Sequence, residues 1–183
     1  MFKKLDFIKP ATLRVMEAFF SDPVEKAYEM EVVKRSGVSK GSANKILRNL
    51  TELGLLKREE KGRMVFYELD LRSPLVRQFK VLYNIWQLND FLENAKQNAV
   101  KIMLFGSCSD GTDAKESDID ILIITKDKAA ARENVSSFNR KSEKRISPII
   151  VDNGEFATMR KQDEPLYERI ERGIVLWEME REI

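Results

Sequence analysis

The sequence predicts a two-domain α+β protein, and three observations support this fold class. A length of 183 residues allows one domain or two small ones, and the apolar fraction of 43% is enough for packed cores. Basic side chains gather in residues 34–63, which carry a net charge of +6 and leave −4 for the remainder. Helices and a hairpin come first, and apolar strands follow a long helix. We therefore expect domains at 1–72 and 99–183, joined by a linker helix at 73–98.

The absence of histidine and the single cysteine exclude several kinds of site. Ser-His-Asp catalysis, Cys-His catalysis and imidazole-ligated metals all need histidine. Cys108 alone forms neither an internal disulfide framework nor a cysteine-rich zinc site. Any metal is therefore expected to be a hard cation held by oxygen, such as Mg²⁺ or Mn²⁺. No apolar run approaches the roughly 20 residues that span a bilayer, and no secretory signal is seen, so we expect a cytoplasmic protein.

Three helices are predicted near the start of the chain. Apolar residues recur at helical spacing in the first of them, and Asp22-Pro23 ends it. Ser39 is the expected N-cap of the third helix, and Gly54 is its expected C′ residue. The predicted helices span residues 11–20, 30–35 and 40–53.

A β-hairpin is predicted after the helices. Its strands are residues 55–58 and 64–69, on either side of a turn at 59–63. Three helices followed by a hairpin is the element order of a winged helix-turn-helix domain, and residues 11–70 resemble winged helix-turn-helix regulators in general. The resemblance implies an N-terminal domain that binds double-stranded DNA and places its third helix in the major groove.

Basic and polar side chains occupy the positions where such a domain would contact DNA. The outward face of the third helix suits groove recognition, and the basic residues of the hairpin would lie near phosphates. The alternative is a solvated helix face in a structural or protein-binding domain, but the +6 segment favours DNA. The expected DNA-binding residues are Lys40, Ser42, Asn44, Lys45 and Arg48 of the helix, and Lys57, Arg58, Lys61 and Arg63 of the hairpin.

A long linker helix is expected to begin at Ser73-Pro74, which supply a cap and a first-turn proline, and to end near Gln97. Because no glycine-rich stretch separates the two halves, this helix is the expected connector. It could also pair with a copy of itself in a homodimer. Its predicted apolar stripe comprises Leu75, Phe79, Leu82 and Trp86, continued by Ile85, Leu88, Leu92 and Ala95.

The second domain is predicted to contain four strands and two helices. Its second strand is so apolar that we expect it to be buried, and Gly173 is expected to turn the chain from the last helix into the last strand. The predicted strands span residues 100–105, 119–125, 146–151 and 174–177, and the predicted helices span 127–140 and 163–172.

A polar motif separates the first two strands of this domain. Gly106-Ser107 directly follows a strand, and glycine allows backbone amides and a hydroxyl to approach an anion. By itself this is a common turn. Asp118 and Asp120 follow, two residues apart, so on a strand they face the same way with about 7 Å between their α-carbons. Two such carboxylates repel each other unless a cation lies between them. The combination predicts a site for a triphosphate and its metal ions.

These residues resemble the signature of the DNA polymerase beta-like nucleotidyltransferase superfamily, most closely its minimal nucleotidyltransferase branch, over residues 99 to 178. The resemblance implies an α/β nucleotidyltransferase-like domain with a mixed sheet. It also implies Mg²⁺-dependent transfer of a nucleoside monophosphate from an NTP to an acceptor, with pyrophosphate leaving. The implied nucleotide-binding residues are Gly106, Ser107, Gly111 and Ser117, and the implied catalytic and metal-binding residues are Asp118 and Asp120.

One feature of the superfamily has no evident counterpart. Its members usually supply a third carboxylate from a later strand, which helps to hold the catalytic metal and to activate the acceptor hydroxyl. In this chain the expected position holds Ser147 or Pro148. Loss of that group would weaken deprotonation of the acceptor more than nucleotide binding. The acidic residues nearby are Glu143, Asp152 and Glu155.

Three functional hypotheses follow from these patterns. The first is a DNA-binding winged helix joined to a minimal nucleotidyltransferase. The second is a non-catalytic transcriptional regulator whose second domain senses nucleotide or dimerises, which the missing carboxylate favours. The third borrows from family relatives that act as antitoxins by nucleotidylating a toxin-like partner protein.

Overall fold

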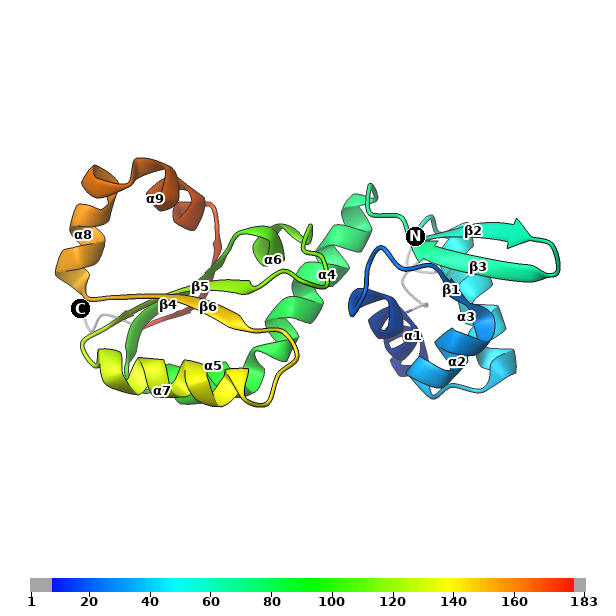
Figure 1. Cartoon of the computed structure of the whole chain (residues 1–183), viewed down its shortest axis with the longest axis horizontal. Coiled ribbons are helices and arrows are strands. Elements are labelled where there is room, and N and C mark those ends of the chain that lie inside the picture. Colours follow the sequence, from blue (N-terminus) through cyan, green and yellow to red (C-terminus); the bar gives the residue numbers. More distant parts are fainter. Residues whose placement is uncertain (1–7, 180–183) are drawn as a thin grey trace. The chain divides into compact units, whose positions relative to one another are not determined.

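Two compact units, which divide between Phe79 and Lys80, make up the protein (Figure 1). The structure is a computed structural model that describes residues 8–179. The first unit contains a three-stranded sheet and the second a four-stranded sheet, each with its own helices. The protein therefore has the mixed α+β character that the sequence predicts. Within residues 8–179, every helix is too short or too polar to cross a membrane.

The first unit places three helices against a small antiparallel sheet in the strand order β1-β3-β2. All three predicted helices are present, shifted by no more than a residue at each end. Fully buried side chains such as Val15, Val32 and Leu47, one from each helix, form the core between them. The elements are α1 (Pro10–Phe20), β1 (Ala27–Tyr28), α2 (Glu29–Ser36), α3 (Lys40–Glu52), β2 (Leu56–Lys61) and β3 (Met64–Leu69).

The ends of α3 are set by the two residues that the sequence singles out. The Ser39 hydroxyl accepts a hydrogen bond from the Ser42 amide at 3.3 Å, as an N-cap does. After Leu53, Gly54 adopts a φ of +70°, which a side chain would disfavour. Both capping predictions are confirmed.

The predicted hairpin turn is too long. Glu59 and Glu60 lie within β2, where they pair with Phe66 and Val65 of β3, and the turn contains only Gly62 and Arg63. From sequence alone, this run of charged residues suggests a turn. In the structure it belongs to one strand of an exposed antiparallel hairpin. The short strand β1, which the sequence analysis missed, pairs with the other side of β3.

The predicted linker helix is broken at Leu88 into α4 (Pro74–Gln87) and α5 (Asn89–Ala95). At the break the Leu88 amide bonds to the carbonyl of Ile85, three residues back, and the Leu88 side chain is fully buried. Phe91 and Ala95 enter the same core. Burial of these side chains under the sheet of the second unit explains why the chain changes direction.

The predicted apolar stripe is wrong for Leu75, Leu82 and Trp86, because α4 buries a different face. Its continuation is confirmed, since Leu88 and Ala95 are buried and Ile85 and Leu92 pack against the same core. Val76, Lys80 and Asn84 are each at most 2% exposed, whereas Leu82 is 55% exposed and Trp86 is 77% exposed. The buried face contains two polar side chains, whose partners are described below. Pairing of two copies through the exposed apolar side chains stays a prediction.

The second unit is a mixed sheet in the order β6-β5-β4-β7, in which β5 and β6 are parallel and the other neighbours antiparallel. Figure 1 shows α5 and α7 on one face of the sheet and α8 and α9 on the other. The elements that follow α5 are β4 (Ala99–Phe105), α6 (Ser107–Asp110), β5 (Ile119–Thr125), α7 (Lys128–Asn139), β6 (Ile146–Val151), α8 (Asn153–Gln162), α9 (Glu164–Glu171) and β7 (Ile174–Glu178).

The helices α6 and α8 were not predicted. A capping box gives α8 a readable start, because the Asp152 carboxylate accepts from the Glu155 amide and the Glu155 carboxylate accepts from the Asp152 amide, both at 2.9 Å. Gly173 then brings the end of α9 against β4. A Cβ atom at Gly173 would lie only 2.4 Å from the carbonyl oxygen of Leu104. The absence of a side chain at this position therefore keeps α9 close to the end of β4, where the motif begins.

Candidate functional site

Gly106 is the point where the chain leaves β4 and meets the second half of the motif. Its φ of +71° and ψ of −158° belong to a region that only glycine adopts readily. A Cβ atom here would lie 2.4 Å from Oδ2 of Asp120. Position 106 therefore requires glycine for two reasons: its backbone conformation and the close carboxylate of Asp120. The structure brings Gly106 and Asp120, predicted to act together, into direct contact.

The residues after Gly106 form a compact turn. The amide and the hydroxyl of Ser109 both donate to the carbonyl oxygen of Gly106, at 3.0 and 2.7 Å. Gly111, with a φ of +67°, closes the single turn of α6 by donating its amide to the carbonyl of Ser107. These bonds fix the backbone beside Asp120 before any ligand arrives.

Asp118 and Asp120 lie at the start of β5. Asp118 is exposed, and Asp120 is half-buried on the same side of the strand as Leu122 and Ile124, which pack beneath α8 and α9. Burial raises the pKa of Asp120, and the charge of Asp118 raises it further, while the charge of Arg169 opposes both. The charge of Asp118 therefore acts on Asp120, as expected for two carboxylates that lie two residues apart on a strand.

A cavity of about 670 Å³ opens beside this turn, and we call it the site cavity. It brings together Gly106, Ser107 and Asp120, which the sequence predicts, with side chains from α9 that it does not. The two arginines of α9 are three residues apart and share one helix face, a spacing that could have signalled them. The lining comprises Gly106, Ser107, Ser109, Asp110, Thr112, Asp120, Pro165, Glu168, Arg169 and Arg172.

Two predicted nucleotide-binding residues, Gly111 and Ser117, are absent from that lining. The Ser117 hydroxyl accepts a hydrogen bond from the Ala114 amide at 2.9 Å, and the Ser117 amide donates to the Ala114 carbonyl. Ser117 therefore closes a local turn before the aspartates, and Gly111 closes α6. The structure gives both residues a role in shaping the loop.

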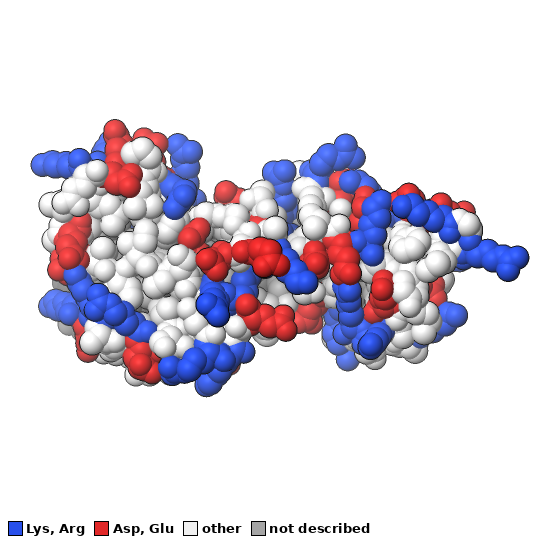
Figure 2. Space-filling view, viewed as in Figure 1, with Lys and Arg blue, Asp and Glu red and all other residues white. Residues whose placement is uncertain are grey.

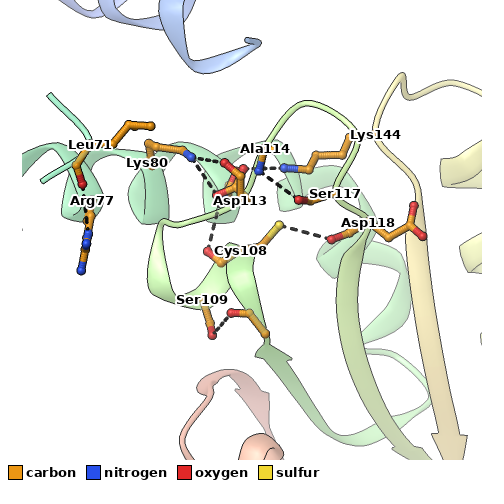
Figure 3. Close-up of polar contacts among 12 residues, drawn as sticks. Leu71, Arg77, Lys80, Cys108, Ser109, Asp113, Ala114, Ser117, Asp118 and Lys144 are labelled. Carbon is orange, nitrogen blue, oxygen red and sulfur yellow. Dashed lines mark hydrogen bonds and ion pairs between the residues drawn. The ribbon is translucent and has the colours of Figure 1, made fainter. Parts of the chain in front are cut away.

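A buried ionic cluster anchors this loop to α4 (Figure 3). Lys80 and Lys144 approach the carboxylate of Asp113, at 3.3 Å from Oδ1 and 2.5 Å from Oδ2, and Asn84 donates to Oδ1 at 2.9 Å. Lys80 also donates to the Asp113 carbonyl, and Asn84 to the carbonyl of Cys108. The carboxylate of Asp118 points away from this cluster. We call Lys80, Asn84, Asp113 and Lys144 the Asp113 cluster.

Burial and charge act in opposite directions on the Asp113 cluster. Burial alone would raise the pKa of Asp113, but hydrogen bonds from Lys144 and Asn84 and the charges of both lysines outweigh it, so the pKa lies below its ordinary value. Burial lowers the pKa of Lys80, although Asp113 opposes that shift. The loop that carries the motif is therefore anchored to α4 through charges that water scarcely reaches.

Cys108 lies inside the turn and is fully buried. Burial raises the pKa of its thiol to about 11, and its sulfur donates weakly to the carbonyl of Asp118 at 3.5 Å. A thiol that stays protonated at neutral pH is a poor nucleophile. Cys108 acts here as a small apolar side chain.

The place of the third carboxylate is occupied by Ser147. In the parallel pair of β5 and β6, Ser147 is the register partner of Asp120, and the two side chains share one face of the sheet. Asp152 and Glu155 are at the other end of β6, where they cap α8 and pair with Lys128. Among residues 8–179, no three acidic or cysteine side chains form a cluster that could hold a metal.

Two carboxylates nevertheless suit one kind of metal site. Mg²⁺ is commonly held by one or two carboxylates together with phosphate oxygens and water, rather than by a complete protein cage. Asp118 and Asp120 match this donor set, provided that a nucleotide supplies the remaining oxygens. A site of this kind would bind metal and nucleotide together.

The predicted DNA-binding residues of the first unit divide into two groups. Lys40, Lys45 and Arg48 are exposed on α3, and within the described part of the chain none of them forms an ion pair. In the hairpin, by contrast, Lys57 pairs with Asp70, Arg58 with Glu60, and Lys61 with Glu59. Figure 2 shows basic side chains at the turn end of the β2–β3 hairpin, where the exposed Arg63 lies.

Asn44 was expected to face outward, and the structure corrects this. It is half-buried and donates to the carboxylate of Glu29 at 2.6 Å, so it fastens α3 to α2. Ser42 remains exposed, although its hydroxyl accepts a hydrogen bond from Ser39 at 3.0 Å. Asn44, Lys45 and Arg48 all border a shallow hollow of about 290 Å³ along α3.

Comparisons with known proteins agree with the motif in the second unit. A family model described as "Polymerase beta, Nucleotidyltransferase" matches residues 87–182, more than half of the chain and all of the site cavity. A presumed nucleotidyltransferase from Sulfolobus solfataricus is 20% identical, with a TM-score of 0.40, over 59% of this chain and 92% of that one. Human N-acetylserotonin methyltransferase with bound SAM is 15% identical, with a TM-score of 0.30, over 50% of this chain and 32% of its own. No curated protein has a matching sequence.

Proposed function

The chain belongs to the polymerase beta nucleotidyltransferase family, and we propose that its site cavity binds an NTP with Mg²⁺ and transfers the nucleoside monophosphate to an acceptor. The observation that carries this proposal is the contact between Gly106 and the carboxylate of Asp120 at the mouth of β5. That contact joins a phosphate-binding turn to a metal-binding carboxylate within one cavity of suitable size.

Each residue has a defined role in the proposed reaction. The amides of the turn and the hydroxyl of Ser107 orient the phosphates, and Asp118 and Asp120 are the residues that would hold Mg²⁺. When bound, the metal supplies charge neutralisation for the phosphoryl oxygens. An acceptor hydroxyl oxygen bonds to the α-phosphorus, the bond to the bridging oxygen breaks, pyrophosphate leaves, and the hydroxyl proton passes to solvent.

Replacement of Asp120 by asparagine tests this mechanism. We expect Asp120→Asn to lower the rate of transfer from labelled NTP by at least about 100-fold, because the metal loses a charged ligand at the reacting phosphate. The assay measures label on candidate nucleic-acid and protein acceptors with Mg²⁺ or Mn²⁺. Asp110→Asn is the matched control, since Asp110 lines the same cavity but lies outside the carboxylate pair. Equal rates for Asp120→Asn and the wild type would contradict the mechanism.

A second candidate function is favoured by Ser147. With serine beside Asp120, the neighbouring position on β6 supplies no carboxylate to take the proton of the acceptor. The protein would then bind nucleotide and metal without turnover, and the second unit would act as a nucleotide sensor. Saturable binding of NTP with no labelled product on any acceptor, including the protein itself, would favour this function.

We further propose that the first unit is a winged helix that binds duplex DNA through α3. The order of its elements, three helices followed by the β2–β3 hairpin, supports this. Lys40, Lys45 and Arg48 of α3 support it as well, since they are exposed and form no ion pair with any residue in 8–179. Lys45 and Arg48 lie on the exposed face that would enter a groove, whereas the acid partners of Lys57, Arg58 and Lys61 partly neutralise the hairpin.

Binding of a fluorescent duplex at several salt concentrations tests this proposal. We expect Lys45→Ala to weaken binding and to reduce the slope of log affinity against log salt by about 1, because one phosphate contact is lost. Lys96→Ala, which removes a half-buried lysine directly after α5 that pairs with Glu93, should leave the slope unchanged. Identical slopes for the two variants would argue against α3 as the DNA-binding element.

A further inference from the structure

The helix α9 supplies a cationic part of the site cavity. Arg169 and Arg172 are three residues apart, so they project from the same face of α9, and both line the cavity with Gly106, Ser107 and Asp120. They are the two cationic side chains in this lining. The position of α9 is itself constrained, because Gly173 admits β4 where any side chain would clash.

The guanidinium of Arg169 is held in place without using its hydrogen-bond donors. It lies over the ring of Phe105, 5.4 Å from the ring centroid, and Phe105 is the residue directly before Gly106. Among the described residues, none accepts a hydrogen bond from Arg169 or forms an ion pair with it. A stacked guanidinium keeps five N–H groups in its plane for an oxyanion.

Arg172 is more loosely engaged. It is exposed, and among the described residues its side chain pairs with Glu168, at 3.4 Å, one helical turn back. An exposed pair of this kind contributes little to stability. Glu168 also lines the cavity, so an incoming phosphate would compete with its carboxylate for Arg172.

The charge balance of the proposed site requires such cations. Two carboxylates and one Mg²⁺ carry no net charge between them, whereas a triphosphate carries roughly −4 at neutral pH. The amides after β4 contribute only partial charges. Arginine binds phosphate through two parallel N–H···O bonds, which are shorter and stronger than bonds between neutral groups.

We propose that Arg169 and Arg172 bind the β- and γ-phosphates of the nucleotide and so select triphosphates over monophosphates. This inference rests on the proposed nucleotide site. Arg169 is the principal contact, because it is already stacked beside the phosphate-binding turn, and Arg172 joins it once phosphate displaces Glu168. The base, the sugar and the α-phosphate are common to triphosphates and monophosphates, so they do not contribute to this selection.

Titration with ATP and with AMP, each with Mn²⁺, tests the proposal by calorimetry. We expect Arg169→Ala to weaken ATP binding by about 10–100-fold, since a bond to a charged group is lost, while AMP binding changes less than about twofold. Arg172→Ala should have a smaller effect of the same kind. Arg160→Ala is the matched control: Arg160 stacks over Tyr167 at 6.0 Å in the same way but lies outside the cavity lining.

The outcomes separate this inference from the proposed function. Equal ATP affinity for Arg169→Ala and Arg160→Ala, with Asp120→Asn still defective, would overturn the role of α9 and leave the nucleotide site intact. Equal losses for ATP and AMP would also overturn it, because the arginine would then not contact the terminal phosphates. Failure of the wild-type protein to bind ATP would overturn both. Binding of Mn²⁺ alone, followed by electron paramagnetic resonance, should be the same in Arg169→Ala and wild type.

Discussion

Replacement of Asp113 by asparagine is expected to destabilise the second unit by about 3–5 kcal/mol. The substitution keeps the shape of the side chain but removes the one negative charge between Lys80 and Lys144. Lys80 is 1% exposed, so its ammonium group would be left in the interior without a counter-charge. Because the cluster also holds the carbonyl of Cys108 through Asn84, the loop of the motif would loosen as well. Denaturant unfolding followed by circular dichroism measures the loss.

The pH dependence of stability provides a second measure of the same residue. The pKa of Asp113 lies below its ordinary value in the folded state, so the unfolded state takes up the proton first as the pH falls. The contribution of Asp113 is therefore complete above its unfolded pKa, near the ordinary value of 3.8, and is lost as the pH falls through the folded pKa. Asp113→Asn should lack this acidic loss. Its stability should instead rise at alkaline pH, where the buried Lys80 releases its proton.

Two further variants test whether the loss of stability comes from the uncompensated buried charge. Glu178→Gln breaks the exposed pair with Lys101 and should cost less than about 1 kcal/mol. Lys80→Met combined with Asp113→Asn should be more stable than Asp113→Asn alone, because an apolar side chain replaces the uncompensated charge. A small loss for Asp113→Asn, similar to that of Glu178→Gln, would contradict the view that the cluster is anchored by charge.

The contrast between the motif and the Asp113 cluster shows which parts of the site a sequence encodes locally. Gly106 and Asp120 could be predicted because each follows or begins an apolar strand, and the strand period fixes the side on which Asp120 lies. Lys80 and Asn84 could not, because a periodic apolar pattern on the opposite side of α4 indicates burial of Leu82 and Trp86. The polar face is buried only because Asp113, which lies 33 residues after Lys80 and 29 after Asn84, satisfies it.

The same distinction applies to the rest of the fold and site. The strands β4, β5 and β6 were predicted nearly to the residue, since each is a predominantly apolar run, although only β4 and β5 are largely buried. Arg169 and Arg172 were not predicted as site residues, because the amphipathic pattern of a helix does not indicate which cavity its polar face borders. Ser147 was one of two candidates for the third position, and only the parallel register with Asp120 decides between it and Pro148.

Replacement of Ser147 by aspartate is expected to raise transfer activity by about 10²–10⁴-fold, the usual contribution of a positioned proton acceptor. Ser147 lies on the strand next to Asp120, roughly 4.8 Å away along the direction of the hydrogen bonds, and it is exposed on the same face. A carboxylate there would accept the proton of an acceptor hydroxyl and would complete the oxygen ligands for metal. The measurement is the rate of nucleotide transfer with Mg²⁺ or Mn²⁺.

Metal binding provides the control for the Ser147 prediction, because it does not depend on knowing the acceptor. Three neighbouring carboxylates repel one another, so Ser147→Asp should lower the melting temperature without metal and raise it with Mn²⁺, relative to wild type. Pro148→Asp places the same charge one residue along β6 on the other face of the sheet, beside Ile121, and should show no tighter binding of Mn²⁺. If Ser147→Asp and Pro148→Asp bind Mn²⁺ equally, Ser147 does not occupy the third position. If Ser147→Asp binds Mn²⁺ more tightly but gains no transfer, the proton acceptor is not what the wild-type site lacks.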